Sequence, residues 1–471
     1  MLPPVLIASL AASLALAERS FVLDAPAEVV ATVSAACHGC DWGRRGHEAA
    51  ALELRVDGRY SQHLLLTRGE GPAAYRVALG RLTAGPHRLQ AVHDLRRSAR
   101  HARDAEIREL AVVAFDPTTR EGRELAHAPV LEARPNSVAK FTDVPLAMWV
   151  ETESLGTGAT RLRYSVVFSN EDGGTPPDRL MATWGRLTDI EYVYGVEVDG
   201  SGRIVSAEYQ GPEHRLLPFS GRREAGHPVL HVKTDNNMVS DRGKTTLRLA
   251  PAAMPFDLTG TSREAVMDAL PWTYAVSARE ARREGRIDAR ARPGSKKVPD
   301  PRRFATVEAC AATRDATIAF SVAVRDANGT TVWFDSDGGR PAFRIGRRAT
   351  EFPNGCFRGA VALPAGTRCD QLAALRFRAF TRIAGKHEPR LPPGSGRARL
   401  RAVNAVFLLG VNDEPGPSQF SWRGDLELPM EGPPVELRIH SGAGVGPSLS
   451  HTPPGAAAPS RAPIDSIVTA R

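Results

Sequence analysis

Lysine and aromatic residues are scarce in this chain, and both shortages bear on what it can bind. Only six of its 61 basic residues are lysine, and aromatic residues make up 6% of the chain. The arginines that supply most of the net charge of +8 are scattered, with no basic stripe and no interleaved aromatic residues. Because a nucleic-acid groove needs both features, the sequence predicts no nucleic-acid partner and leaves an anionic polysaccharide or membrane surface open.

Long apolar runs are missing after the first residues, so the sequence predicts no transmembrane segment. The run MLPPVLIASLAASLALA is short and ends in Ala15-Leu16-Ala17, the kind of small-residue site at which secretory signals are cut. No lysine or arginine precedes this run, which departs from the usual signal pattern. We nevertheless expect a signal peptide over residues 1–17, cleavage after Ala17, and a secreted or periplasmic protein.

Familiar catalytic and cofactor motifs are absent as well. The sequence has no G-x-S-x-G elbow, P-loop or H-E-x-x-H zinc motif. It has no nucleotide or haem signature, since Asp41 rather than histidine follows the C-H-G-C run. Five cysteines in an exported chain predict two disulfides and one free thiol. We expect one disulfide within Cys37–Cys40 and one among Cys310, Cys356 and Cys369.

The chain is rich in short alternating strands separated by turn residues. Asp57-Gly58 and Asn328-Gly329 each stand between two such runs, which is a strong hairpin pattern. The sequence therefore predicts a mainly β protein: two flanking antiparallel β-sandwich modules of jelly-roll or immunoglobulin-like type around a β-rich central domain with a short helical extension. The expected boundaries are 18–125 for the N-terminal β-sandwich, 131–290 for the central domain, 291–303 for a linker, 304–440 for the C-terminal β-sandwich and 441–471 for a disordered tail.

Two helices are expected at the end of the central domain. Thr261-Ser262-Arg263-Glu264 has the spacing of a capping box, in which a hydroxyl and a carboxylate satisfy each other's backbone donors. Pro271 cannot continue that helix and suits the first position of a second one, which runs toward Gly285.

Polar residues concentrate between residues 161 and 241. Asn170, Glu171 and Asp172 follow one strand, and Asp189 and Glu191 alternate with apolar residues in the next. Strict alternation places this acidic pair on the face opposite Tyr194. Further polar side chains in the stretch, which could contact a ligand, are Trp184, Arg186, His227, His231 and Asn236.

Three interpretations of this polar stretch remain open. Oxygen ligands from the loop residues Asn170, Glu171, Asp172 and Asp235, together with Asp189 and Glu191, could hold a divalent cation, with Ca²⁺ favoured by that ligand chemistry. Asp189 and Glu191 could instead be the catalytic carboxylates of a hydrolase, if the pKa of one is raised. Surface ion pairs and turn caps are the third interpretation, since Asp and Asn in loops often serve only that purpose.

The segment TDIEYVYGVEVDGSGRI, followed by HPVLHVKTDNNM, resembles the layout of necrosis-inducing secreted sandwich proteins and their vacuolar-sorting-like relatives. Those proteins have a G-D-W-E strand and then an H-P-V strand, and acidic residues of the toxins bind a divalent cation. The matching residues are Asp189, Glu191 and His227, whereas Thr188 and Ile190 replace the family's glycine and tryptophan. The resemblance covers under a fifth of the chain and implies a cation near the acidic pair.

From these features we expect a binding protein for a carbohydrate or an envelope surface, with a cation-assisted site in the central domain. A hydrolase of an extracellular polymer and a structural or adhesion scaffold are the alternatives. A pocket containing Asp189, Glu191 and His231 would favour the enzyme, and an open platform with exposed Trp184 would favour binding.

Overall fold

The computed structural model describes residues 15–156, 158–292, 294–326, 328–346, 352, 355–384 and 389–439. Most of the predicted signal segment and the whole of the predicted tail lie outside these ranges. The described chain is mainly β, with several antiparallel sheets and few helices, which confirms the predicted fold class. Among its helices, none is long and apolar enough to cross a membrane.

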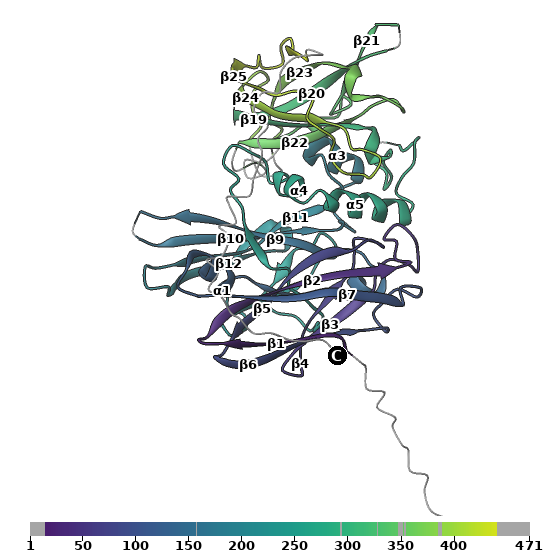
Figure 1. Ribbon diagram of the computed structural model, residues 1–471. Coiled ribbons are helices and arrows are strands. Elements are labelled where there is room, and N and C mark those ends of the chain that lie inside the picture. The colour runs from purple at the N-terminus through teal and green to yellow at the C-terminus, as the bar shows by residue number, and fades with distance from the viewer. Residues whose placement is uncertain are drawn as a thin grey trace, which may run out of the picture. The chain divides into compact units, whose positions relative to one another are not determined.

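Two antiparallel sheets with one shared hydrophobic core build the N-terminal part (Figure 1). Their strands are β1 (Ala15–Leu23), β2 (Ala27–His38), β3 (Ala51–Val56), β4 (Arg59–Leu65), β5 (Ala73–Leu82), β6 (Gly85–His93) and β7 (Asp104–Phe115). One sheet has the order β1-β6-β3-β4 and the other β5-β2-β7. The predicted Asp57-Gly58 turn joins β3 to β4 with φ of +52° and +77°, so this hairpin is confirmed.

The central part also has two sheets around a shared core. Its strands are β8 (Val130–Glu132), β9 (Pro145–Ser154), β10 (Thr160–Phe168), β11 (Asp189–Val198), β12 (Ile204–Gly211), β13 (Arg215–Pro218), β14 (Arg223–Glu224), β15 (His227–Val232), β16 (Val239–Ser240), β17 (Arg248–Leu249) and β18 (Ala253–Pro255). The six-stranded sheet has the order β13-β12-β11-β10-β9-β18; the smaller has the order β14-β15-β8-β17, with β16 on β15. Two pairs, β9 with β18 and β8 with β15, are parallel.

The α-helices of the described chain lie before, between and after these central strands. They are α1 (Arg120–Ala126), α2 (Asn136–Ala139), α3 (Pro177–Trp184), α4 (Ala265–Ala269) and α5 (Trp272–Arg283). The predicted second helix is confirmed as α5. Pro271 is its N-cap residue, whereas the prediction placed it at the first helical position. The predicted capping box is wrong. Glu264 is the N-cap of α4 and makes no side-chain cap, while the hydroxyls of Thr261 and Ser262 donate to Glu308 at 2.6 and 2.9 Å.

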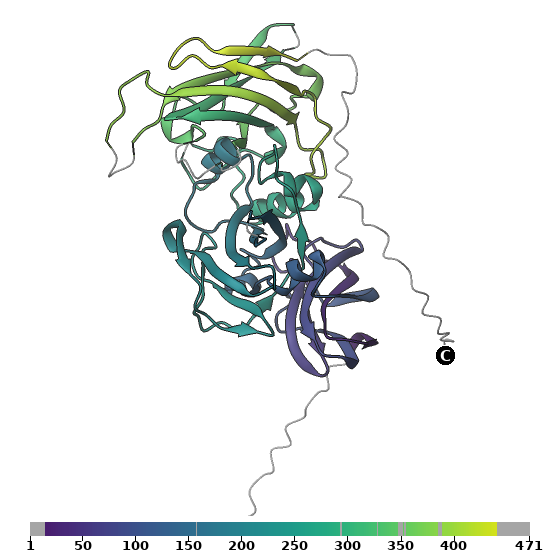
Figure 2. The same ribbon diagram turned by 90° about the vertical axis from the view of Figure 1, so that its left-hand side faces the viewer.

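The C-terminal part again has two antiparallel sheets that share a core (Figure 2). Its strands are β19 (Phe304–Arg314), β20 (Ala316–Arg325), β21 (Thr331–Asp335), β22 (Cys356–Ala362), β23 (Leu372–Thr381), β24 (Arg397–Phe407), β25 (Trp422–Glu427) and β26 (Val435–Arg438). The sheet orders are β22-β19-β24-β25 and β21-β20-β23-β26. The hairpin predicted at Asn328-Gly329 joins β20 to β21 and is confirmed. The jelly-roll or immunoglobulin-like strand order and the domain boundaries stay predictions.

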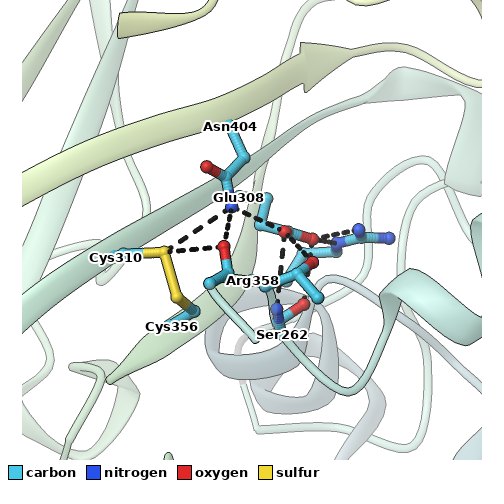
Figure 3. The surroundings of a disulfide bond; sticks show 8 residues. Ser262, Glu308, Cys310, Cys356, Arg358 and Asn404 are labelled. Carbon is cyan, nitrogen blue, oxygen red and sulfur yellow. Dashed lines mark hydrogen bonds and ion pairs between the residues drawn. A yellow bond between two sulfur atoms is a disulfide. The ribbon is translucent and has the colours of Figure 1, made fainter. Parts of the chain in front are cut away.

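Both predicted disulfides form, Cys37–Cys40 and Cys310–Cys356, and Cys369 is free. Cys310 and Cys356 are directly opposite in the β19–β22 ladder, and two residues along it Glu308 is opposite Arg358. Figure 3 shows this disulfide beside the buried polar cluster around Glu308. The cluster connects the C-terminal sheet with the segment that leads into α4.

Candidate functional site

The predicted polar loops of the central domain meet in the structure. The N–H of Gly173, in the loop after β10, donates to the carbonyl of Asp235, in the loop after β15, at 3.0 Å. Asn237 is fully buried at a φ of +54°, a conformation that asparagine tolerates better than most residues. Its Nδ2 donates to the Asn170 carbonyl and to Asp189 Oδ2, both at 3.0 Å. Asn237 therefore fixes the second loop to the first loop and to β11.

A β-bulge decides where the acidic pair points. The pairing of β11 with β10 shifts by one residue between Tyr192 and Tyr194. Such a shift reverses the alternation of faces beyond it. Asp189 and Glu191 therefore lie on the same face as Tyr194, within the space between the two central sheets, and the predicted opposite face is wrong.

Burial changes the chemistry of three carboxyl groups in this region. Glu171, Asp189 and Glu191 are each less than a tenth exposed. Burial raises the pKa of Glu171 to about 8, and the negative charge of Asp189 adds to the rise. Burial followed by repulsion from Asp189 also holds the pKa of Glu191 well above its usual range. The pKa of Asp189 itself is raised by burial. Burial therefore disfavours the charged form of each group, and a cation bound beside them would offset that cost.

Arg186 and Arg263 lower the pKa values of Asp189 and Glu191, but burial outweighs them. Arg186 lies 4.0 Å from Asp189, but its Nε bonds to Glu264 at 3.1 Å, so its charge is shared between two carboxylates. Glu191 accepts a hydrogen bond from Gln210 at 3.1 Å, and the ring of His214 lies 3.9 Å away. Gln210 and His214 could not be predicted from the sequence, because only the β11–β12 pairing brings β12 alongside the acidic pair.

Trp184 ends α3 and is half-buried. The guanidinium groups of Arg179 and Arg186 lie over its ring at 5.7 and 6.0 Å from the centroid. Since these arginines occupy its surroundings, Trp184 does not form an open stacking platform.

Of the four cation ligands predicted in the loops, three already contact arginine. Arg286 donates to Asn170 Oδ1 at 2.8 Å and pairs with Asp172 at 3.3 Å, and Arg134 pairs with Asp235. The fourth, Glu171, belongs with the buried acids instead. Among the described residues, the ligand oxygens of Glu171, Asp189 and Glu191 do not all lie within 4.8 Å of one another. A cation bound by these acids would have to draw their side chains together.

The predicted ligand-binding histidines lie elsewhere and are engaged. Both ring nitrogens of His227 face acceptors at 3.0 Å, the Ala128 carbonyl and Glu28 of β2. His231 pairs with Glu132 across β15 and β8 at 3.0 Å. Asn236 stays in the loop, where its Oδ1 accepts from Thr234. The two histidines therefore connect strands and do not join the acidic pair.

A cleft of about 1100 Å³ opens beside the first loop, and Asp172 and Asp235 lie in its lining. Glu48 and Glu284 are the other acidic side chains of this lining. Against these four acids stand nine basic side chains, Arg45, Arg96, Arg100, Arg134, Lys140, Arg283, Arg286, Lys296 and Lys297. We call this the basic cleft.

Much of the positive charge of the basic cleft is uncompensated. Within the described part of the chain, five of the nine cations have no ion-pair partner, namely Arg45, Arg96, Arg100, Lys140 and Lys296. All five are exposed. The basic run around residues 282–297 is the sequence pattern that overlaps this feature, and by itself it does not indicate a shared site.

Comparisons with known proteins leave the family open. No family model and no curated protein matches the chain. A solved sugar-binding protein, the EclA C-terminal domain, is 25% identical over 21% of this chain and 66% of its own, with a TM-score of 0.17. A β-glucuronidase from Bifidobacterium dentium, complexed with coumarin-3-O-glucuronide, is 14% identical over 42% of this chain and 31% of its own, with a TM-score of 0.12. At such TM-scores neither likeness carries an inference about this chain.

Proposed function

We propose that this protein binds an anionic polysaccharide in the basic cleft, as an exported binding protein rather than an enzyme. The observation that carries the proposal is the excess of nine basic over four acidic side chains around about 1100 Å³ of open space. A cleft lined by one sign of charge concentrates ligands of the opposite sign. Two disulfides are compatible with the export that such a ligand requires.

The composition of the cleft favours a saccharide over a nucleic acid. Phe141 is the one aromatic residue in its lining, whereas single-stranded nucleic acids bind through stacking on several aromatic rings. Asn136, Thr142 and Ser98 are further polar side chains of the lining, and each already hydrogen-bonds within the protein.

Binding is favoured over hydrolysis because the acidic pair has no access to this cleft. Neither Asp189 nor Glu191 belongs to its lining, and both are buried between sheets. A glycosidase needs its carboxylates on either side of the substrate bond. A structural or adhesion scaffold would not require the uncompensated positive charge of the basic cleft.

Calorimetry with polygalacturonate, neutral dextran and single-stranded DNA of matched length tests the proposal. We expect polygalacturonate to bind, dextran not to bind, and Lys296→Ser/Lys297→Ser to weaken binding at least tenfold. Arg397→Ser/Arg423→Ser removes two exposed charges from the C-terminal sheet and is the matched control. Equal binding of dextran, tighter binding of DNA, or full affinity in the cleft variant would overturn the proposal.

The divalent cation also remains a proposal, and Glu171, Asp189 and Glu191 support it better than the arginine-paired Asp172 and Asp235. Three buried carboxyl groups that repel one another gain most from a cation with oxygen ligands, such as Ca²⁺. We expect Ca²⁺ to raise the Tm of the full chain and Asp189→Asn to remove the effect, with Asp235→Asn as the control. An unchanged Tm in Ca²⁺ would end this part of the proposal.

A further inference from the structure

A second, separate cluster of metal-binding residues lies in the N-terminal part of the chain. Glu53 in β3, His63 in β4 and Asp94 just after β6 each offer one ligand atom, and these atoms all lie within 4.8 Å of one another. Among the described residues, no other group of three such side chains meets this condition. From this geometry we propose that Glu53, His63 and Asp94 bind a zinc ion.

The register of the sheet explains why these three side chains meet. Glu53 is directly opposite His63 in the β3–β4 ladder and directly opposite Val92 in the β3–β6 ladder. Opposed residues of neighbouring strands share a face. Asp94 follows Val92 by two residues, so it continues the same face where β6 ends. Three adjacent segments therefore present their side chains to one point.

The spacing of the ligand atoms suits a tetrahedral ion. His63 Nε2 lies 3.2 Å from Asp94 Oδ2. At bond lengths of about 2.0–2.2 Å, two ligands of tetrahedral zinc are roughly 3.3–3.6 Å apart. The ion would take the place of the Nε2 proton with little movement of either side chain. One imidazole and two carboxylates, completed by water, form the three-ligand set of an open zinc site.

A hydrogen bond on the other ring nitrogen of His63 orients it for this role. The hydroxyl of Tyr60 lies 2.8 Å from His63 Nδ1 and accepts a hydrogen bond from the backbone N–H of Arg248. Zinc-binding histidines typically use their second nitrogen in this way, since the bond fixes the ring and its tautomer. His63 is 3% exposed, so its ring has little other freedom.

Two arginines form ion pairs with the carboxylates of Glu53 and Asp94. Arg55 Nε lies 2.6 Å from Glu53, and Arg97 Nη1 lies 2.7 Å from Asp94. Their side chains are 37% and 46% exposed, and such surface pairs contribute little to stability. Both guanidinium groups are therefore free to turn into water when an ion replaces their charge.

Calorimetric titration of the chelator-treated full chain with Zn²⁺ tests the proposal. We expect one zinc per chain, a rise in Tm with zinc, and an affinity at least tenfold lower in His63→Gln and in Glu53→Gln. Cobalt supplies a second readout, because a tetrahedral Co²⁺ complex with nitrogen and oxygen ligands absorbs strongly in the visible range. Glu53→Gln is the safer variant for folding, since Glu53 is half-buried and, among the described residues, its side chain bonds to the partly exposed Arg55.

The controls separate this site from other places where zinc could bind. His47 and His101 stack at 4.7 Å, and His47→Gln/His101→Gln removes that pair while leaving His63 intact. Asp189→Asn removes one of the three buried acids of the central part. Full affinity in both controls supports the proposal. No saturable zinc binding, or binding that survives His63→Gln and Glu53→Gln, overturns it. Neither result depends on whether the basic cleft binds a polysaccharide.

Discussion

At the scale of single residues, Arg358 joins Glu308 of the C-terminal sheet to Asp268 of α4. It is 1% exposed and pairs with Glu308 (Figure 3). It also donates to Asp268 at 2.6 and 2.8 Å. Although burial alone would raise it, the pKa of Glu308 is lowered to about 2, chiefly by Arg358. Removing the arginine therefore leaves an ionised carboxylate buried without its cation.

We expect Arg358→Met to lower the free energy of unfolding by about 3–5 kcal/mol, as for other broken buried ion pairs. Urea unfolding followed by circular dichroism measures the loss. Arg399→Met is the control, because Arg399 and its partner Asp425 are both more than two-fifths exposed. The urea midpoint of that variant should not change. Equal effects of the two substitutions would contradict the ascribed role of Arg358.

Glu171 predicts a pH dependence of stability whose sign follows from its raised pKa. The folded value of about 8 lies above the ordinary 4.5, so the folded state binds the proton more tightly than the unfolded state does. Stability from this group is present below pH 4.5 and is lost as the pH rises toward 8. Glu171→Gln should remove that loss, so its Tm should exceed the parent's at pH 8.5 more than at pH 5.

Differential scanning calorimetry at the two pH values measures this difference, with the exposed Glu121→Gln as the control. Glutamine keeps an oxygen for the N–H of Thr175, which bonds to Glu171 at 2.7 Å, so the change is confined to charge. An identical pH dependence in parent and variant would show that Glu171 is ionised in the folded protein.

At the scale of elements, the packing of the 170–175 loop on the 234–237 loop depends on Gly174. Its φ is +102°, and a Cβ there would lie 2.3 Å from Glu171 Oε1 and 3.2 Å from Asn236. Gly202 also has a positive φ, +82°, but nothing lies within 4 Å of the added atom. The two positions therefore share backbone strain and differ in crowding.

We expect Gly202→Ala to cost about 1 kcal/mol of stability from strain alone, and Gly174→Ala to cost at least about twice that. Thermal unfolding measures both costs. If the loops act as one unit, Gly174→Ala should also weaken polygalacturonate binding, because Asp172 and Asp235 line the basic cleft. Equal losses of unfolding free energy in the two variants would show that crowding around Gly174 does not affect stability.

Elements that depend on neighbouring residues could be predicted from the sequence, and those that depend on distant residues or on a bulge could not. The Asp57-Gly58 and Asn328-Gly329 hairpins depend on turn residues and adjacent strands, so a local pattern was enough. The capping box failed because Glu308, over 40 residues away in β19, bonds the two hydroxyls. The face of Asp189 and Glu191 was wrong because one inserted residue reversed the alternation, and no turn residue marks that bulge.

At the scale of the whole molecule, the same limit applies to the candidate site. The sequence could indicate that the loops at residues 170–172 and 235–237 are polar, and the structure brings them together. It could not indicate the basic cleft, because the nine cations come from segments as far apart as Arg45 and Lys297. Arginines that are scattered in the sequence form a shared site only after the strands and loops between them have packed.

The cations of the basic cleft fall into two groups that are far apart in the sequence. One group of cations, Arg45, Arg96 and Arg100, belongs to N-terminal loops, and the other, Lys140, Lys296 and Lys297, belongs to the central domain and the segment after it. A polyanion that spans the cleft displaces counterions from both groups, so its affinity should fall steeply with salt. Replacing either group by serine should weaken polygalacturonate binding and flatten the plot of log affinity against log salt to a similar degree. A flattened plot for one group alone would confine the ligand to one wall of the cleft, and an unchanged plot for both would place the ligand outside it.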